Sequence, residues 1–207
     1  MHEVGHTSMV GRAAAASIVL NAALTPVRTR VWPMHGTHDL RLVPLSVAAM
    51  RALVEGDLAT ASSEAGVPLT PYLVEAGWLW KIRLEQVADD PRYLDWVARA
   101  AVDRATGAVV GHVGFHGPPD QRGMVEVAYS VDPEHRRRGY ATAMVETALR
   151  WAEDAPGASV VRASISPANT ASLATLRPFG FEPAGEQWDD EDGLELLFER
   201  PVRQGAR

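Results

Sequence analysis

The most constraining feature of this sequence is an arginine-rich turn between a strand candidate and a helix candidate. Residues 124–131 consist mostly of β-prone side chains, and Pro133 ends the run. From Ala141 to Asp154, apolar residues recur at helical spacing. The turn at 136–139 thus places three arginines and a glycine at the beginning of a helix, where free N–H groups and the helix dipole favour an anion. We expect it to bind a phosphate-bearing ligand, although a basic turn that only caps a helix would show the same residues.

A second strand candidate and a short helix follow. Residues 160–166 alternate between two faces as a strand does, and the run stops at Pro167. Asn169 then suits the N-cap of a helix, and Gly180 lies near the end of that helix. The chain therefore contains a strand, the arginine-rich turn, a helix, a second strand and a second helix in succession.

Together these segments resemble the acyl-CoA signature of the GNAT N-acetyltransferase superfamily. The glycine turn of that superfamily reads Arg or Gln, two residues, Gly, one residue, then Gly or Ala, and Arg136, Gly139 and Ala141 meet it. Its later strand and Asn-x-x-Ser helix are matched by residues 160–172. The resemblance extends over residues 38–202. Within the superfamily it favours the Rim-type branch, which acetylates protein N-termini, and related small-molecule acetyltransferases.

The resemblance implies an α/β (α+β) fold, with a mixed, mostly antiparallel twisted sheet that is splayed at its centre and flanked by helices. The remaining sequence agrees with that order. It predicts a strand at 39–44, a helix after Ser46, a second helical stretch after Pro71 and hairpins at 105–107 and 189–193. We expect one acetyltransferase domain over residues 37–203. Residues 1–36 are expected to form an N-terminal extension, helical or weakly ordered, and residues 204–207 a tail.

Composition narrows the function. The chain has 207 residues and no cysteine, which excludes a disulfide framework, a thiolate metal site and a cysteine nucleophile. Its net charge of −6 disfavours a nucleic-acid partner, and no apolar run is long enough to cross a bilayer. The apolar run at 13–24 faintly resembles a secretory signal but lacks a basic leading segment. We expect a cytoplasmic enzyme without a metal, a membrane anchor or a nucleic-acid partner, and a homodimer is left open.

The resemblance also assigns residues to acetyl-CoA, the implied co-substrate. The backbone at the end of the 124–131 strand would pair with the pantetheine arm, and the turn would wrap the pyrophosphate. Asn169 would bond the pantetheine arm, cap its helix, or do both. Glycine at position 139 would let the backbone approach the anion closely. The expected cofactor residues are Tyr129, Ser130, Val131, Arg136, Arg137, Arg138, Gly139, Tyr140, Ala141, Thr142 and Asn169.

Acetyl transfer to an amine needs a base, because only the neutral amine attacks the thioester. A lysine-type amine, with a pKa of about 10.4, is neutral about one part in a thousand near pH 7. Glu126 is the first candidate base, directly or through water, since the family often places a glutamate on this strand. An exposed structural glutamate is the alternative reading. His116 and, after it, His112 are weaker candidates on the neighbouring strand.

A general acid for the departing thiolate is harder to find. Many superfamily members carry a tyrosine seven residues after the motif asparagine, but here that position is Leu176. Tyr129 and Tyr140 remain as candidates because of their position next to the turn. The acidic segment 186–195 with Trp188 either receives a cationic acceptor or is an ordinary acidic turn. From a different class, the chain could be a non-catalytic acyl-CoA-binding sensor or interaction module.

Overall fold

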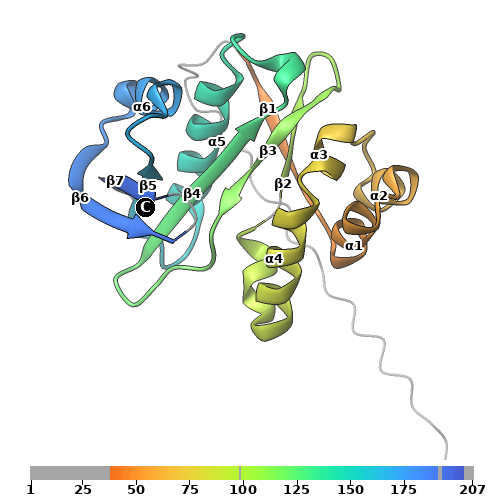
Figure 1. Ribbon diagram of the computed structural model, residues 1–207, viewed down its shortest axis with the longest axis horizontal. Helices are drawn as coiled ribbons and strands as arrows, with labels where there is room; N and C mark the ends of the chain where they lie inside the picture. The colour runs from red at the N-terminus through yellow and green to blue at the C-terminus, as the bar shows by residue number, and fades with distance from the viewer. Residues whose placement is uncertain (1–37, 98, 191–192, 203–207) are drawn as a thin grey trace, which may run out of the picture. The chain divides into compact units, whose positions relative to one another are not determined.

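The computed structural model describes residues 38–97, 99–190 and 193–202, which form a mixed sheet with helices on both faces (Figure 1). The strands are β1 Leu40–Pro44, β2 Arg99–Asp103, β3 Val109–Phe115, β4 Met124–Val131, β5 Val160–Ile165, β6 Glu182–Asp189 and β7 Gly193–Pro201. The α-helices are α1 Val47–Glu55, α2 Leu58–Ala65, α3 Pro71–Glu75, α4 Gly77–Asp89, α5 Tyr140–Asp154 and α6 Thr170–Leu176. Short 3₁₀ turns, η1 Pro91–Asp95, η2 Pro133–His135 and η3 Arg177–Phe179, lie between them. The expectations for residues 1–36 and 204–207 fall outside the described residues.

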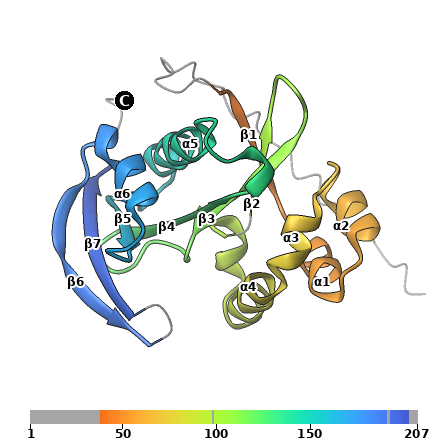
Figure 2. The same cartoon turned by 45° about the horizontal axis from the view of Figure 1, so that its top comes forward.

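Within the described residues, the sheet has seven strands in the order β1-β2-β3-β4-β5-β7-β6, and only the β4–β5 pair is parallel. That pair is short. Its register runs from Met124 opposite Val160 to Glu126 opposite Arg162 and then stops, although both strands continue. Figures 1 and 2 show β4 and β5 diverging beyond this point. The expected mixed α/β sheet with a central splay is confirmed.

Two hydrophobic cores cover the two faces of the sheet. On one face, α5 and α6 pack over a cluster that includes Val113, Val125, Val161 and Met144. On the other, α1 to α4 pack over a second cluster that includes Trp80. Helices α5 and α6 therefore lie on one face of the sheet and helices α1 to α4 on the other, as Figure 2 shows.

Local sequence signals account for several of the element boundaries. Ser46 caps α1, its hydroxyl accepting a hydrogen bond from the Ala49 amide at 3.0 Å, and Pro71 opens α3. The helical stretch expected after Pro71 is two helices, α3 and α4, which meet at Ala76. The break lets α3 turn toward β4, where the hydroxyl of Tyr72 is hydrogen-bonded to that of Ser130.

Candidate active site

The arginine-rich turn presents unused backbone donors to solvent. Arg137 and Gly139 both have a left-handed backbone, with φ of 60° and 87°, and Gly139 is the N-cap of α5 without a capping side chain. The first backbone bond of α5 runs from the Ala143 amide to the Gly139 carbonyl at 3.1 Å. The amides of residues 140–142 therefore precede the helical ladder and are free to meet an anion. Glycine at 139 is required by its own conformation, in addition to the close approach expected from sequence.

Side chains from distant elements hold this turn. The Tyr140 hydroxyl donates to Asp103 at 2.7 Å, and the His38 ring bonds the Arg138 carbonyl at 2.6 Å. Arg136 donates through Nε to the Val131 carbonyl at 3.2 Å. Burial raises the pKa of Asp103, but hydrogen bonds led by the one from Tyr140 outweigh it and hold that pKa below its usual value. Because its hydroxyl is committed to Asp103, Tyr140 is a poor candidate for the general acid.

A cavity of about 590 Å³ opens between this turn, the end of β4 and α6. Ten of the eleven residues expected to bind the cofactor line it, and Arg138 is the exception. Asn169 both lines the cavity and caps α6, its side chain accepting from the Ser172 amide at 3.1 Å, so its two expected roles are compatible. Sequence reasoning missed four further lining residues, His135, Ala171, Ser172 and Thr175.

The end of β4 offers unpaired backbone groups to this cavity. The Glu126 carbonyl accepts from the His116 amide, and the Asp132 amide donates to the Val110 carbonyl, so even-numbered residues of β4 bond β3. Since a strand turns its polar groups alternately to its two sides, Val127, Tyr129 and Val131 turn theirs toward β5. The register with β5 has already ended there. The Val131 carbonyl already accepts a hydrogen bond from Arg136. The backbone N–H and carbonyl of Tyr129 therefore remain as the main hydrogen-bonding edge for an extended ligand.

A second cavity, of about 530 Å³, lies on the opposite side of β4 beneath α3 and α4. It shares Tyr129 and Ser130 with the first cavity, so the two meet at this point of the strand. We call the first the cofactor cavity and the second the acceptor cavity. The acceptor cavity is lined by Tyr72, Glu75, Ala76, Trp78, Leu79, Ile82, Arg83, Gln86, His112, His116, Ala128, Tyr129 and Ser130.

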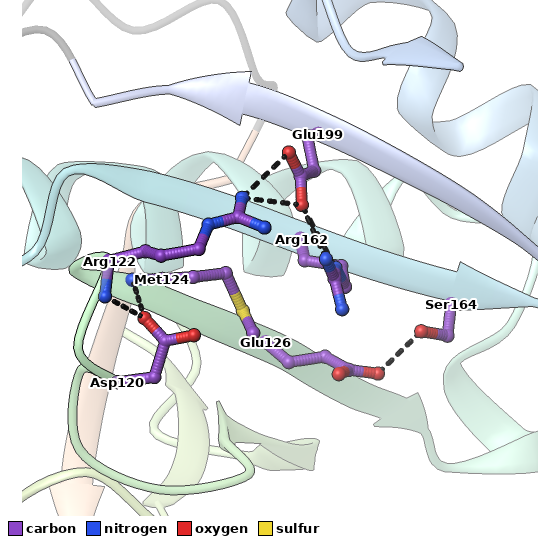
Figure 3. Close-up of polar contacts among 7 residues, drawn as sticks. All are labelled: Asp120, Arg122, Met124, Glu126, Arg162, Ser164 and Glu199. Carbon is purple, nitrogen blue, oxygen red and sulfur yellow. Dashed lines mark hydrogen bonds and ion pairs between the residues drawn. The ribbon is translucent and has the colours of Figure 1, made fainter. Parts of the chain in front are cut away.

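Glu126 lies beside the acceptor cavity but does not line it. Figure 3 shows its carboxylate reaching from β4 to Ser164 on β5, whose hydroxyl donates to it at 2.6 Å. The neighbouring Arg162 is paired with Glu199 instead, at 2.6 Å. The same Glu126 carboxylate is 3.8 Å from Nδ1 of His116, and His116 does line the cavity. The first and second candidate bases are thus neighbours, with His116 toward the acceptor.

Both histidines of the acceptor cavity are poised to be neutral near pH 7. The surrounding protein atoms partly desolvate the His116 ring and lower its pKa although half of the side chain is exposed, and the opposing attraction of Glu126 does not cancel this shift. Burial, with a smaller contribution from the charge of Arg83, lowers the pKa of His112 to about 4. A neutral imidazole can accept a proton, but a group with a pKa of about 4 is a weak base at neutral pH. His116, whose side chain is 52% exposed, is therefore better suited than His112.

The remaining candidates, the tyrosines and the acidic hairpin, differ in whether they line a cavity. Leu176 is only 3% exposed, lies in the core under α5 and provides no polar group. Tyr129 lines both cavities, and its buried hydroxyl has no hydrogen-bond partner among the described residues. Trp188 is 75% exposed and lines neither cavity, while Glu191 and Asp192 lie outside the described residues.

In the described part of the chain, no three His, Asp or Glu side chains gather as a metal site, and no helix could span a membrane.

A splayed mixed sheet with an uncapped helix N-terminus at the splay is the architecture that the resemblance to the GNAT superfamily implies. The family model described as an acetyltransferase (GNAT) domain matches residues 39–182, and the chain belongs to this family. Curated relatives include two uncharacterized N-acetyltransferases of Bacillus subtilis strain 168. YjdG is 34% identical over 73 residues, which cover 35% of this chain and 44% of YjdG. YoaA is 30% identical over 82 residues, which cover 40% of this chain and 46% of YoaA. The chain thus matches less than half the length of these relatives.

A solved structure with the same fold is that of the aminoglycoside acetyltransferase AAC(6′)-Ib in complex with coenzyme A. It aligns with a TM-score of 0.54 at 15% identity and covers 80% of this chain and 96% of its own. At that identity the likeness concerns the fold.

Proposed function

We propose that this protein is an acetyl-CoA-dependent N-acetyltransferase that transfers an acetyl group to a primary amine. The observation that carries the proposal is the meeting of two cavities at Tyr129 and Ser130, one of them built on the phosphate-type turn. An arrangement of this kind brings two substrates together across one strand without a covalent enzyme intermediate.

The cofactor cavity suits acetyl-CoA in its chemistry. The free amides at the beginning of α5 and the guanidinium groups of Arg136 and Arg137 would hold the pyrophosphate. The open edge of β4 at Tyr129 would hold the amide-bearing pantetheine arm, with Asn169 on the opposite wall. Acetyl-CoA supplies the acetyl group as an activated thioester. The backbone N–H groups of β4 that face the gap are suitable donors for the developing oxyanion.

His116 would take the proton of the amine, and Glu126 would position its imidazole. His116 lines the acceptor cavity, whereas Glu126 is within 3.8 Å of its Nδ1 and lines neither cavity. This arrangement is supported by Ser164, which fixes the Glu126 carboxylate from β5. Glu126 thus keeps the role of a base only through His116.

Acceptors with a primary amine fall into two groups, small molecules and protein N-termini. The acceptor cavity under α3 and α4 favours a small molecule, since the side chains that line it, several of them aromatic or aliphatic, offer no extended strand edge for a peptide. The narrower Rim-type assignment has a protein N-terminus as acceptor, and peptide N-termini are therefore included among the acceptors to be tested.

The test is CoA release from acetyl-CoA against a panel of small amines and peptide N-termini. We expect turnover in the wild type and a fall in kcat of about 10²–10⁴ in His116→Gln, with the KM for acetyl-CoA unchanged. Below the lowered pKa of His116 the wild type should lose activity, because the protonated ring accepts no proton. His116→Gln should instead gain activity steadily toward alkaline pH, where the amine deprotonates unaided.

Glu126→Gln distinguishes the two roles. If it acts through His116, it should lower kcat in the wild type and change little in a His116→Gln background. A further loss in that background would mean that Glu126 itself takes the proton. Glu85→Gln, an exposed change on α4, is the matched control. Acetyl-CoA binding by calorimetry without CoA release for any amine would instead establish a non-catalytic acyl-CoA sensor.

A further inference from the structure

The floor of the acceptor cavity carries a buried arginine. Arg83, on α4, lines the cavity and is only 7% exposed. Its Nη1 donates to the side chain of Gln86 at 2.8 Å and to the His116 carbonyl at 3.3 Å. Its Nε and Nη2 make no hydrogen bond within the described residues. Three of its five N–H donors, one on Nε and two on Nη2, are therefore available to a ligand that enters the cavity.

The charge of Arg83 also lacks a close partner. Among the described residues, no carboxylate oxygen lies within 4.0 Å of its guanidinium nitrogens. Glu126 acts on it from a greater distance and is itself bound to Ser164. Burial lowers the pKa of Arg83, yet an arginine stays protonated at any physiological pH. A buried cation is costly unless an anion approaches it, so this site is incomplete without a negatively charged group.

The surroundings set the size and orientation of that group. Arg83 bonds the backbone of His116, so the guanidinium lies next to the residue proposed to receive the proton of the amine. Leu79 and Trp78 form apolar walls, and Glu75 lies on the exposed rim. An anion near the rim would meet the charge of Glu75, whereas one at the floor meets Arg83. The cavity therefore favours a ligand with its anionic group inward and close to its amine.

We propose that the acceptor is a small amine that also bears a carboxylate, as amino acids do, and that Arg83 binds this carboxylate through Nε and Nη2. Planar carboxylates match the guanidinium fork in a bidentate manner, which a lysine could not reproduce. This inference rests on the proposed acetyltransferase function and adds the chemical class of its acceptor. Arg83 would thereby determine specificity and place the amine beside His116.

The experiment compares a panel of amino acids with the carboxamide of each, which keeps the amine and side chain but has no negative charge. We expect a higher kcat/KM for the acids, corrected for the neutral amine fraction, by about tenfold to a hundredfold. Arg83→Gln should remove this preference, mainly through the KM of the acid, and Arg83→Lys should restore it only in part. Comparing the acid-to-amide ratio of each variant with that of the wild type cancels the difference in amine pKa between the two compounds.

Two controls keep the outcome decisive. Lys81→Gln removes a cation from the exposed face of the same helix and should leave the preference unchanged. If Arg83→Gln does not fold, inhibition of the wild type by N-acetylated amino acids against their carboxamides still reports carboxylate binding. Turnover of carboxamides or peptide N-termini as fast as of acids would overturn the inference and leave the proposed function standing. No turnover with any amine would instead reject the function itself.

Discussion

Tyr129 lies where the cofactor and acceptor cavities meet, and its side chain packs against the core under α5. Its buried hydroxyl lacks a partner among the described residues, which costs about 1–3 kcal/mol of stability. A group kept at such a cost is typical of a functional site. Of the two candidate general acids, Tyr129 is therefore the one whose hydroxyl is not committed to another described residue, whereas that of Tyr140 is bonded to Asp103.

Substituting phenylalanine at Tyr129 and at Tyr140 tests this assignment. Tyr129→Phe should lower kcat by about 10²-fold or more without loss of stability, because the removed hydroxyl makes no hydrogen bond in the described structure. Tyr140→Phe should cost about 1–3 kcal/mol in denaturant unfolding, since it leaves the buried Asp103 carboxylate without its 2.7 Å donor. A Tyr129→Phe enzyme with normal kcat would show that the thiolate leaves unaided.

At the residue scale, the sequence predicts contiguous motifs well and dispersed sites poorly. All turn residues except Arg138 line the cofactor cavity, because their positions depend on local backbone geometry. Arg83 could not be assigned from a motif, because the groups that define its site, the His116 carbonyl just after β3 and Glu126 on β4, lie far along the chain. One signal was present. Arg83 occupies the same buried stripe of α4 as Trp80 and Val87, and a charged residue in an apolar stripe indicates a site.

At the element scale, the pairing of β3 with β4 leaves no room for a side chain at Gly111. Gly111 on β3 has φ of 147°, and a Cβ atom built there would lie 2.1 Å from the Ser130 carbonyl oxygen. Ser130 lines both cavities and bonds Tyr72 of α3. Glycine at 111 therefore sets the position of the strand segment around which the site is built.

Alanine substitutions at Gly111 and Gly107 separate the close contact from backbone strain. Gly107 has φ of 74° with open space around its Cα, so Gly107→Ala should cost only about 1 kcal/mol. Gly111→Ala meets the β4 backbone as well and should cost about 3 kcal/mol or more in chemical denaturation. It should also reduce turnover in any protein that remains folded. Equal costs for the two variants would contradict the role of the close approach.

Element prediction succeeded where a capping or breaking residue marked the boundary. Helix α5 and the final hairpin lie where the sequence places them. Helix α2 was missed, although Asp57 caps it, accepting from the Thr60 amide at 2.9 Å, and Gly66 ends it with a left-handed backbone. The division between α3 and α4 falls at Ala76 and Gly77, so the sequence did carry a local signal there, a glycine of low helix propensity. The hydrogen bond between Tyr72 on α3 and Ser130 on β4 is a tertiary contact that accompanies the break, and local sequence does not encode it.

At the scale of the whole molecule, the two cavities lie on opposite sides of β4 and share only Tyr129 and Ser130 among their lining residues. Each substrate can thus be bound while the other is in place. The chain also has no cysteine to carry an acetyl group. Both facts favour direct transfer within a ternary complex over an acetylated enzyme.

Initial-rate kinetics test this arrangement. Varying acetyl-CoA at several fixed acceptor concentrations should give intersecting double-reciprocal lines, because both substrates must be bound before transfer. Mass spectrometry after incubation with acetyl-CoA alone should show an unmodified chain. Parallel lines together with a stable acetyl adduct that the acceptor discharges would refute direct transfer.

The splay between β4 and β5 also bears on stability. Beyond Glu126 the edge of β4 faces a gap, and its donors and acceptors there have no strand to pair with. An amide-bearing arm laid along that edge would act as the missing strand of the sheet. Anything that binds only the folded chain stabilises it by mass action, by about 2.7 kcal/mol at a hundredfold excess over Kd. The protein with this ligand bound should accordingly resist heat and proteolysis better than the unbound protein, because the ligand completes the hydrogen bonding of the sheet.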